Sequence, residues 1–177
     1  MLTQRVLTES QELTVDTEVE KASRSNGRAR RVLLVEDDGS HRWVIRRLLE
    51  SAFGEEVSVE EAVAGEKALE RATAEPSLDL ILLDLGLPGV DGFEVLRRLR
   101  AEERTRRVPV IVVSSSEQDE DVRRAYEEGA NSFISKSDSP EKTLQRLRLL
   151  PVYWLELNRL PDERSPSRRS SKSSARP

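Results

Sequence analysis

The stretch SLDLILLDLGLPG, residues 77–89, decides the fold of this chain. Leu78 and the run 80–83 are apolar, and the run ends at the carboxylate of Asp84. A short segment that is apolar at nearly every position is typical of a strand buried on both faces, as in a parallel sheet. The sequence therefore places Asp84 at the carboxyl end of a central strand, where open α/β sheets bind ligands. The alternative for Asp84 taken alone is a cap for the turn before the next helix.

Strands and helices alternate on both sides of this stretch. Strand-like runs lie at 30–35, 57–62, 78–83, 108–113 and 132–135. Between and after them, the pattern predicts a helix capped by Gly39 and Ser40, helices over 66–74, 91–100 and 117–128, and a last helix that begins at Pro140. Five strand–helix units over about 120 residues call for an α/β fold, a doubly wound parallel sheet with right-handed crossovers.

Polar side chains follow four of the predicted strands. They are Glu36, Asp37, Asp84, Ser114 and Lys136. Because parallel strands end at the same edge of a sheet, we expect these side chains to converge. Three adjacent carboxylates repel one another unless a cation neutralises them, and oxygen ligands favour Mg²⁺. With the hydroxyl and the ammonium, the set predicts a cradle for a phosphoryl group. The alternative for the lysine is a purely structural ion pair with the acids.

Four motifs in this order resemble the receiver domain of two-component response regulators. They are VLLVEDD at 32–38, LLDLGLPGVDG at 82–92, VPVIVVS at 108–114 and GANSFISK at 129–136. The resemblance covers about residues 30–150. It implies a flavodoxin-like, five-stranded sheet with strand order 2-1-3-4-5.

The resemblance also implies which residues bind the phosphoryl group and the metal. Asp84 would accept a phosphoryl group from a phosphohistidine of a sensor histidine kinase. Glu36 and Asp37 would hold Mg²⁺ together with Asp84 and the backbone carbonyl of Gly86. The same site would then hydrolyse its own phosphate slowly, so the chain is expected to be a phosphoacceptor and not an enzyme in the usual sense.

One further residue of the motifs is implied to bind the phosphoryl group, and two are implied to respond to phosphorylation. Lys136 would pair with the phosphoryl oxygens, Ser114 would hydrogen-bond one of them, and the aromatic ring of Phe133 would follow Ser114. Ser137 stands where most receivers have proline after the lysine, which puts a cis peptide there in doubt because a non-proline cis bond costs about 2.5–4 kcal/mol. His41 is expected to be a surface residue without a ligand role.

Composition excludes several other classes of protein. Hydrophobic residues make up 36% and charged residues 35% of the chain, and the mean hydropathy is −0.58, so polar residues are expected to gather outside the core. The net charge of −4 gives no general reason to expect nucleic-acid binding. Cysteine is absent, which rules out disulfides and thiol chemistry. No apolar run approaches a membrane span and no signal peptide is present, so we expect a cytoplasmic protein. Residues 1–29 are predicted to be a mobile tail with a short transient helix near 10–21.

An apolar arm at 151–161 follows the predicted receiver domain at 30–150. Tyr153, Trp154, Leu155 and Leu157 give it a density that a solvated tail does not carry, so it either folds back on its own domain or meets a partner. The arm resembles that of the small response regulators of bacterial and cyanobacterial phytochromes, which implies a homodimer and a bacteriophytochrome as the kinase. Residues 162–177 are rich in Ser and Arg and are expected to be a disordered basic tail, too short for a DNA-binding domain.

Three functions remain open from sequence. The first is a single-domain phosphoacceptor in a phosphorelay. The second is a receiver-like interaction module that does not use a phosphate, which a missing acid or lysine would favour, although none is missing. The third is a nucleic-acid binder through the basic tail, which salt-sensitive retention on heparin would indicate.

Overall fold

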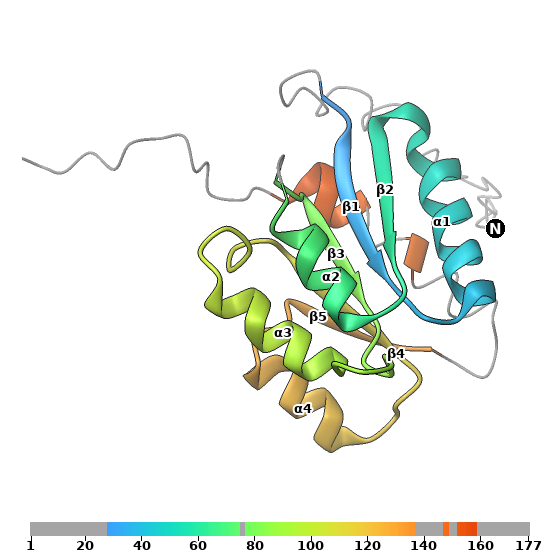
Figure 1. Ribbon diagram of the computed structural model, residues 1–177. Coiled ribbons are helices and arrows are strands. Elements are labelled where there is room, and N and C mark those ends of the chain that lie inside the picture. The colour runs from blue at the N-terminus through green and yellow to red at the C-terminus, as the bar shows by residue number, and fades with distance from the viewer. Residues whose placement is uncertain (1–27, 75–76, 137–146, 149–151, 159–177) are drawn as a thin grey trace, which may run out of the picture.

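The sheet has five parallel strands in the order β2-β1-β3-β4-β5 (Figure 1), as predicted. The computed structural model describes residues 28–74, 77–136, 147–148 and 152–158. The strands are β1 (Arg30–Val35), β2 (Val57–Ala62), β3 (Leu80–Leu83), β4 (Val110–Ser114) and β5 (Ser132–Ser135). The helices are α1 (Gly39–Phe53), the 3₁₀ turn η2 (Gly54–Glu56), α2 (Gly65–Ala72), α3 (Gly92–Ala101), α4 (Asp119–Glu127) and the π-helical turn η3 (Tyr153–Leu157).

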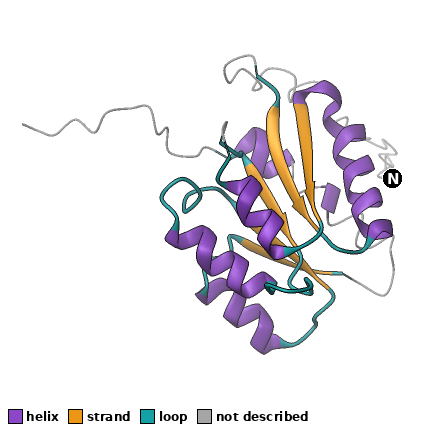
Figure 2. Ribbon diagram, in the orientation of Figure 1, coloured by secondary structure: helices purple, strands orange, loops and turns teal. Residues whose placement is uncertain are grey.

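The sheet lies between two layers of helices (Figure 2), because its inner strands are apolar on both faces. Along β1, Val32 and Leu34 pack on the α1 side, whereas Leu33 and Val35 pack on the side of α2, α3 and α4. All four are at most 1% exposed. A side-chain period of two on a strand buried on both faces produces this split into two cores.

Helix boundaries correct the sequence prediction in one respect that concerns the site. Asp38, and not Gly39 or Ser40, is the N-cap of α1, and its carboxylate accepts hydrogen bonds from the backbone N–H groups of Ser40 and His41, each at 2.8 Å. The carboxylate of Asp38 accepts from two first-turn N–H groups, which Gly39 cannot do because it has no side chain and Ser40 does not do because it already lies inside the helix. Helix α1 therefore begins one residue earlier than the predicted cap pair allowed.

The layer of α2, α3 and α4 is joined to the sheet by polar contacts as well as apolar ones. Arg100 of α3 donates to the backbone oxygens of Gly129, at 2.8 Å, and Val108, at 2.9 Å, and to the side-chain oxygen of Asn131, at 2.8 Å. At the other end of α3, Glu94 pairs with Arg98 at 2.6 Å. Helix α4 contributes little apolar surface, since Ala125 is its only buried residue, which agrees with the sparse apolar face in its sequence.

Near the C-terminus, Leu147 and Leu155 close the core on the α1 side of the sheet, at 2% and 5% exposure. The remainder of the helix predicted from Pro140, the Lys136–Ser137 peptide and the predicted tails at 1–27 and 162–177 lie outside the described residues. None of the helices in the described part of the chain is both long enough and apolar enough to cross a membrane.

Candidate phosphoryl-acceptor site

The carboxyl edge of the sheet brings together side chains that are far apart in sequence. The ammonium of Lys136, which directly follows β5, lies 2.6 Å from Oδ2 of Asp84 after β3 and 2.8 Å from Oε2 of Glu36 after β1. The Lys136 backbone N–H also donates to the carbonyl of Ser114 at 2.7 Å. The convergence predicted from the strand ends is therefore observed for these residues.

Burial makes these charges depend on one another. Asp84 is 6% exposed and Glu36 only 1%. Burial raises the pKa of Glu36, the charge of Asp84 raises it further, and the bond from Lys136 opposes both effects. Burial acts to lower the pKa of Lys136, but its hydrogen bonds to Asp84 and Glu36 prevail and raise that pKa. The site thus holds the ammonium of Lys136 in its charged form and favours the protonated form of Glu36 more than solvent does.

The three predicted carboxylates are close enough to share one metal ion. Glu36, Asp37 and Asp84 each offer an oxygen, and these oxygens lie within 4.8 Å of one another. Asp37 is exposed, so the cluster is open to solvent on one side. Gly86 lies beside it, because its backbone N–H donates to Oδ1 of Asp84 at 3.2 Å. A hard-oxygen set with an open side fits a divalent cation that retains water ligands.

Asp84 does not cap the following helix, although it does shape the turn. The N-cap of α3 is Asp91, whose carboxylate accepts from the backbone N–H of Glu94 at 2.8 Å. The first residue of α3, Gly92, is packed so tightly that a Cβ there would lie 2.4 Å from the Asp84 carbonyl and 2.5 Å from Leu85 Cα. The turn after β3 is therefore held against α3 and presents the Asp84 carboxylate at a fixed position.

The two residues expected to sense phosphorylation lie on β4 and β5. Ser114 is 3% exposed, and its hydroxyl accepts from the backbone N–H of Ser116 at 3.2 Å. Phe133 pairs in register with Val112 and is partly buried against the α2–α3–α4 core. Both residues lie near the carboxyl edge of the sheet, and among the described residues the side chain of neither one bonds to Asp84 or to Lys136.

Comparison with known proteins shows the family to which this chain belongs. The family model for the response regulator receiver domain matches residues 32–148. The chain belongs to this family. A curated relative of the receiver, the probable methanogenesis regulatory protein FilR2 of Methanothrix harundinacea, is 38% identical over 135 residues, which are 73% of this chain and 86% of FilR2.

Two solved structures resemble this receiver closely. The phosphorylated cyanobacterial phytochrome response regulator RcpA superposes with a TM-score of 0.69 at 30% identity and covers 76% of this chain and 99% of its own. The Mn²⁺-bound response regulator Rcp1 superposes with a TM-score of 0.67 at 29% identity and covers 75% of this chain and 99% of its own. The flavodoxin-like fold expected from the motifs is thereby confirmed.

Sequence reasoning missed one residue that shapes the receiver site. Arg42 of α1 donates to the backbone carbonyls of Glu36, at 2.9 Å, and Asp37, at 3.1 Å, and to the carboxylate of Glu61 at 3.2 Å. It thereby holds the β1–α1 loop that carries two of the acids. The feature of the sequence that could have indicated this role is the position of Arg42 in the first turn of the helix that follows the acidic loop. His41, as expected, is a surface residue, and its Nδ1 is 3.8 Å from Glu36 Oε1.

The apolar arm divides its residues between the receiver core and solvent. Leu155 is buried in the α1-side core, and Trp154 packs against that core. Tyr153 is 50% and Leu157 61% exposed, and the Tyr153 ring meets Trp154 edge-on at 5.2 Å. Of the two alternatives for the arm, folding back on its own domain is thus observed for Leu155, which is then not free for a partner.

Proposed function

We propose that this chain is a cytoplasmic phosphoacceptor in a two-component phosphorelay, and that Asp84 is phosphorylated by a sensor histidine kinase. The observation that carries the proposal is the ammonium of Lys136 bonded to both Asp84 and Glu36 at the carboxyl edge of the sheet. In the transfer, a carboxylate oxygen of Asp84 forms a bond to phosphorus, the phosphorus–nitrogen bond of the phosphohistidine breaks, and the imidazole leaves with the electron pair. Lys136 is placed to stabilise negative charge on the transferring oxygens.

The acids fit a magnesium cofactor. The cluster has three carboxylates and one ammonium, that of Lys136, which pairs with Glu36 and Asp84, so negative charge is in excess. Glu36, Asp37 and Asp84, with the backbone carbonyl of Gly86, would hold Mg²⁺, which supplies positive charge to the phosphoryl oxygens when it is bound. The Mn²⁺ in Rcp1 supports this assignment, because Mn²⁺ and Mg²⁺ both favour oxygen ligands.

Ser114 and Phe133 complete the proposal as the conformational readout. The hydroxyl of Ser114 would leave the Ser116 N–H and bond the new phosphoryl group, and the ring of Phe133 would follow into the space that is vacated. The partial burial of Phe133 supports this, since a fully packed ring has no room to turn. We further propose that the site dephosphorylates itself slowly.

The partner we propose is a phytochrome-type kinase. The support is the similarity to RcpA and Rcp1 over three quarters of this chain. A phosphorylation-independent interaction module is the competing function. It would bind its partner equally well when Asp84 is replaced by asparagine.

The test is phosphorylation of the full chain by acetyl phosphate with Mg²⁺, followed by intact mass. We expect one acid-labile phosphoryl group on the wild type and none on Asp84→Asn. The matched control is Asp79→Asn, which makes the same change next to the amino end of β3, where Asp79 accepts from the Arg31 N–H at 2.8 Å. Asp79→Asn should be phosphorylated like the wild type. A phosphate that maps to a serine or to His41 would refute the proposal.

We also propose that the exposed side of the arm forms a homodimer contact. Tyr153 and Leu157 remain exposed although neighbouring arm residues pack on the receiver, and aromatic side chains are frequent interface anchors. Sedimentation of the wild type and of Tyr153→Ser/Leu157→Ser tests this. A monomeric wild type, or a variant that dimerises as well as the wild type, would exclude the contact.

A further inference from the structure

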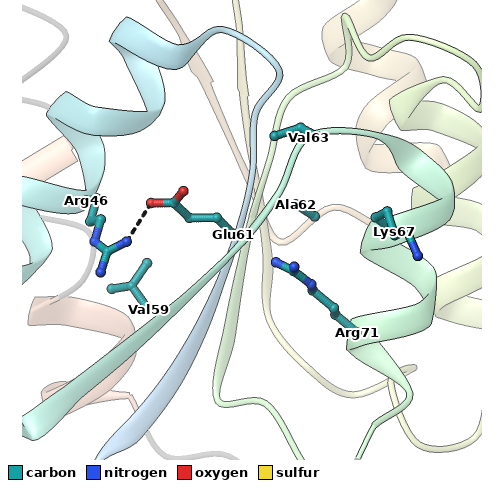
Figure 3. Close-up of a pocket in the computed structure, with 7 residues that line it drawn as sticks. All are labelled: Arg46, Val59, Glu61, Ala62, Val63, Lys67 and Arg71. Atoms are coloured by element: carbon teal, nitrogen blue, oxygen red, sulfur yellow. Dashed lines mark hydrogen bonds and ion pairs between the residues drawn. The ribbon is translucent and has the colours of Figure 1, made fainter.

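A pocket of about 370 Å³ lies at the outer edge of β2, apart from the phosphoryl site. Figure 3 shows Arg46, Val59 and Glu61 on the α1 side of β2, and Lys67 and Arg71 on the α2 side. Val63, which is 49% exposed, lines the end of the pocket. None of the residues proposed to bind the phosphoryl group or the metal lines it.

The backbone of β2 is unpaired along this pocket. Strand β2 is at the edge of the sheet and its only neighbour in the sheet is β1. The Ala62 carbonyl accepts from the Glu36 N–H at 3.0 Å, so the backbone groups of Ala62 face β1. Because these groups alternate along a strand, the N–H and C=O of Val59 and Glu61 face outward into the pocket. An edge of this kind is a template for one more strand.

Positive charge is in excess on the α2 face of the open edge, because Arg46 on the α1 face is paired with both Glu50 and Glu61. Glu61, the only acid in the pocket, is already bonded to Arg46 at 3.0 Å and to Arg42 at 3.2 Å. Lys67 pairs with Glu70. Arg71 forms no ion pair within 4 Å with any residue in the described part of the chain, and its guanidinium points toward β2 (Figure 3). In a chain of net charge −4, this edge therefore favours an acidic segment.

The chain itself contains a segment of matching pattern at 13–20, outside the described residues. It reads LTVDTEVE. Leu13, Val15 and Val19 alternate with Asp16, Glu18 and Glu20, so an extended segment presents an apolar face and an acidic face. Only nine residues separate it from β1, and they can span about 30 Å, whereas the far edge of β2 is two strand spacings, roughly 10 Å, from β1.

We propose that residues 13–20 add to the open edge of β2 as an additional strand of the same sheet, in place of the transient helix that their composition indicated. The strand runs antiparallel to β2, because the short linker must return to Arg30, which lies beside Val57 at the start of β2. Its acids face Lys67 and Arg71 on the α2 side, and its apolar residues face the Val59 side. The inference does not depend on the proposed phosphoryl transfer.

The alternative explanation is that the cations only protect an edge strand from pairing with other molecules. That role needs exposed charge but no acidic counterpart in the same chain. The two explanations differ in what happens to the outward backbone amides of β2. Added pairing protects the amides of Val59 and Glu61 from exchange with solvent, whereas bare charge leaves them exposed.

The experiment is residue-resolved amide hydrogen exchange on the full chain. We expect the Val59 and Glu61 amides to exchange at least about tenfold more slowly in the wild type than in Lys67→Glu/Arg71→Glu or in Asp16→Lys/Glu18→Lys. Combining both pairs of changes restores opposite charges and should restore protection. The matched control is Glu9→Lys/Glu12→Lys, which reverses two acids outside the segment and should leave protection unchanged.

Unchanged exchange of the Leu33 amide in the core shows that each variant is folded. Rapid exchange of Val59 and Glu61 in the wild type, or protection that neither reversal changes, would overturn the proposal. Protection that disappears on dilution would assign the segment to a second copy of the chain and would also overturn the intramolecular strand.

Discussion

Replacement of Lys136 by methionine isolates the charge at the centre of the candidate site. Methionine keeps the length of the side chain but leaves the carboxylates of Glu36 and Asp84, both nearly buried, without their shared ammonium. Removing one partner of a buried ion pair costs about 3–5 kcal/mol, and we take about 3 kcal/mol here because the site is open at Asp37. The expected result in EDTA is a urea midpoint lowered by roughly 1–2 M.

Added Mg²⁺ should reverse most of this loss. The ion brings positive charge to the same acids, and a ligand at 100 times its dissociation constant stabilises the folded state by about 2.7 kcal/mol. The variant gains more than the wild type, because in the wild type the lysine already neutralises two of the acids. The difference in unfolding free energy between the two proteins should therefore shrink when urea titrations in EDTA are repeated in Mg²⁺.

The matched control is Lys67→Met, the same substitution at an exposed lysine of α2. It should change the unfolding midpoint little, and equally with and without Mg²⁺. The reasoning is refuted if Lys136→Met is no less stable in EDTA than Lys67→Met, or if Mg²⁺ leaves the difference between Lys136→Met and wild type unchanged.

Three further substitutions test the supports of the fold. Gly92→Ala should lower the thermal midpoint by several degrees and slow phosphorylation, since its Cβ would collide with the turn after β3, whereas Gly39→Ala, with 3.8 Å of space, should not. Glu94→Gln should destabilise the protein at neutral pH. The hydrogen bond from Arg98 lowers the pKa of Glu94 in the folded protein. Its stabilisation is therefore present at pH values above the pKa of Glu94 in the unfolded chain and is lost as the pH falls through the pKa of Glu94 in the folded protein. A difference in urea midpoint between wild type and variant that persists at acidic pH would contradict this. Arg100→Lys should cost about 2 kcal/mol in urea unfolding, because an ammonium cannot reach the spread acceptors of the guanidinium, and a neutral result would refute that role.

The sequence predicted the sheet and the convergence at its edge because both follow from local patterns. The apolar runs identify the strands, and parallel strands bring Glu36, Asp84 and Lys136 to one edge whatever the loops do. The helix cap and the side-chain contacts to the loop were harder to predict from sequence, because they depend on the three-dimensional arrangement of nearby residues. The cap at Asp38 competed with two plausible neighbours, and the reach of Arg42 to the backbone carbonyls of the loop has no signature in composition.

The arm shows the same limit more clearly. Leu155 and Leu157 are equivalent as letters in an apolar segment, yet one is 5% and the other 61% exposed. Which of them meets the core depends on the turn geometry of η3 against α1-side residues that are more than a hundred positions away in sequence. Density of apolar residues therefore predicted burial of the segment but not its orientation.

The ion pair between Asp84 and Lys136 joins two strands of unequal freedom. Among the described strands, β3 is paired on both sides, whereas β5 is paired only with β4. Backbone hydrogen bonds therefore hold the strand before Asp84 more firmly than the strand before Lys136. A reaction at Asp84 that separates its carboxylate from the Lys136 ammonium would act on the end of β5. Loss of the ion pair would therefore act more readily on β5, an edge strand of the sheet, than on the central strand β3.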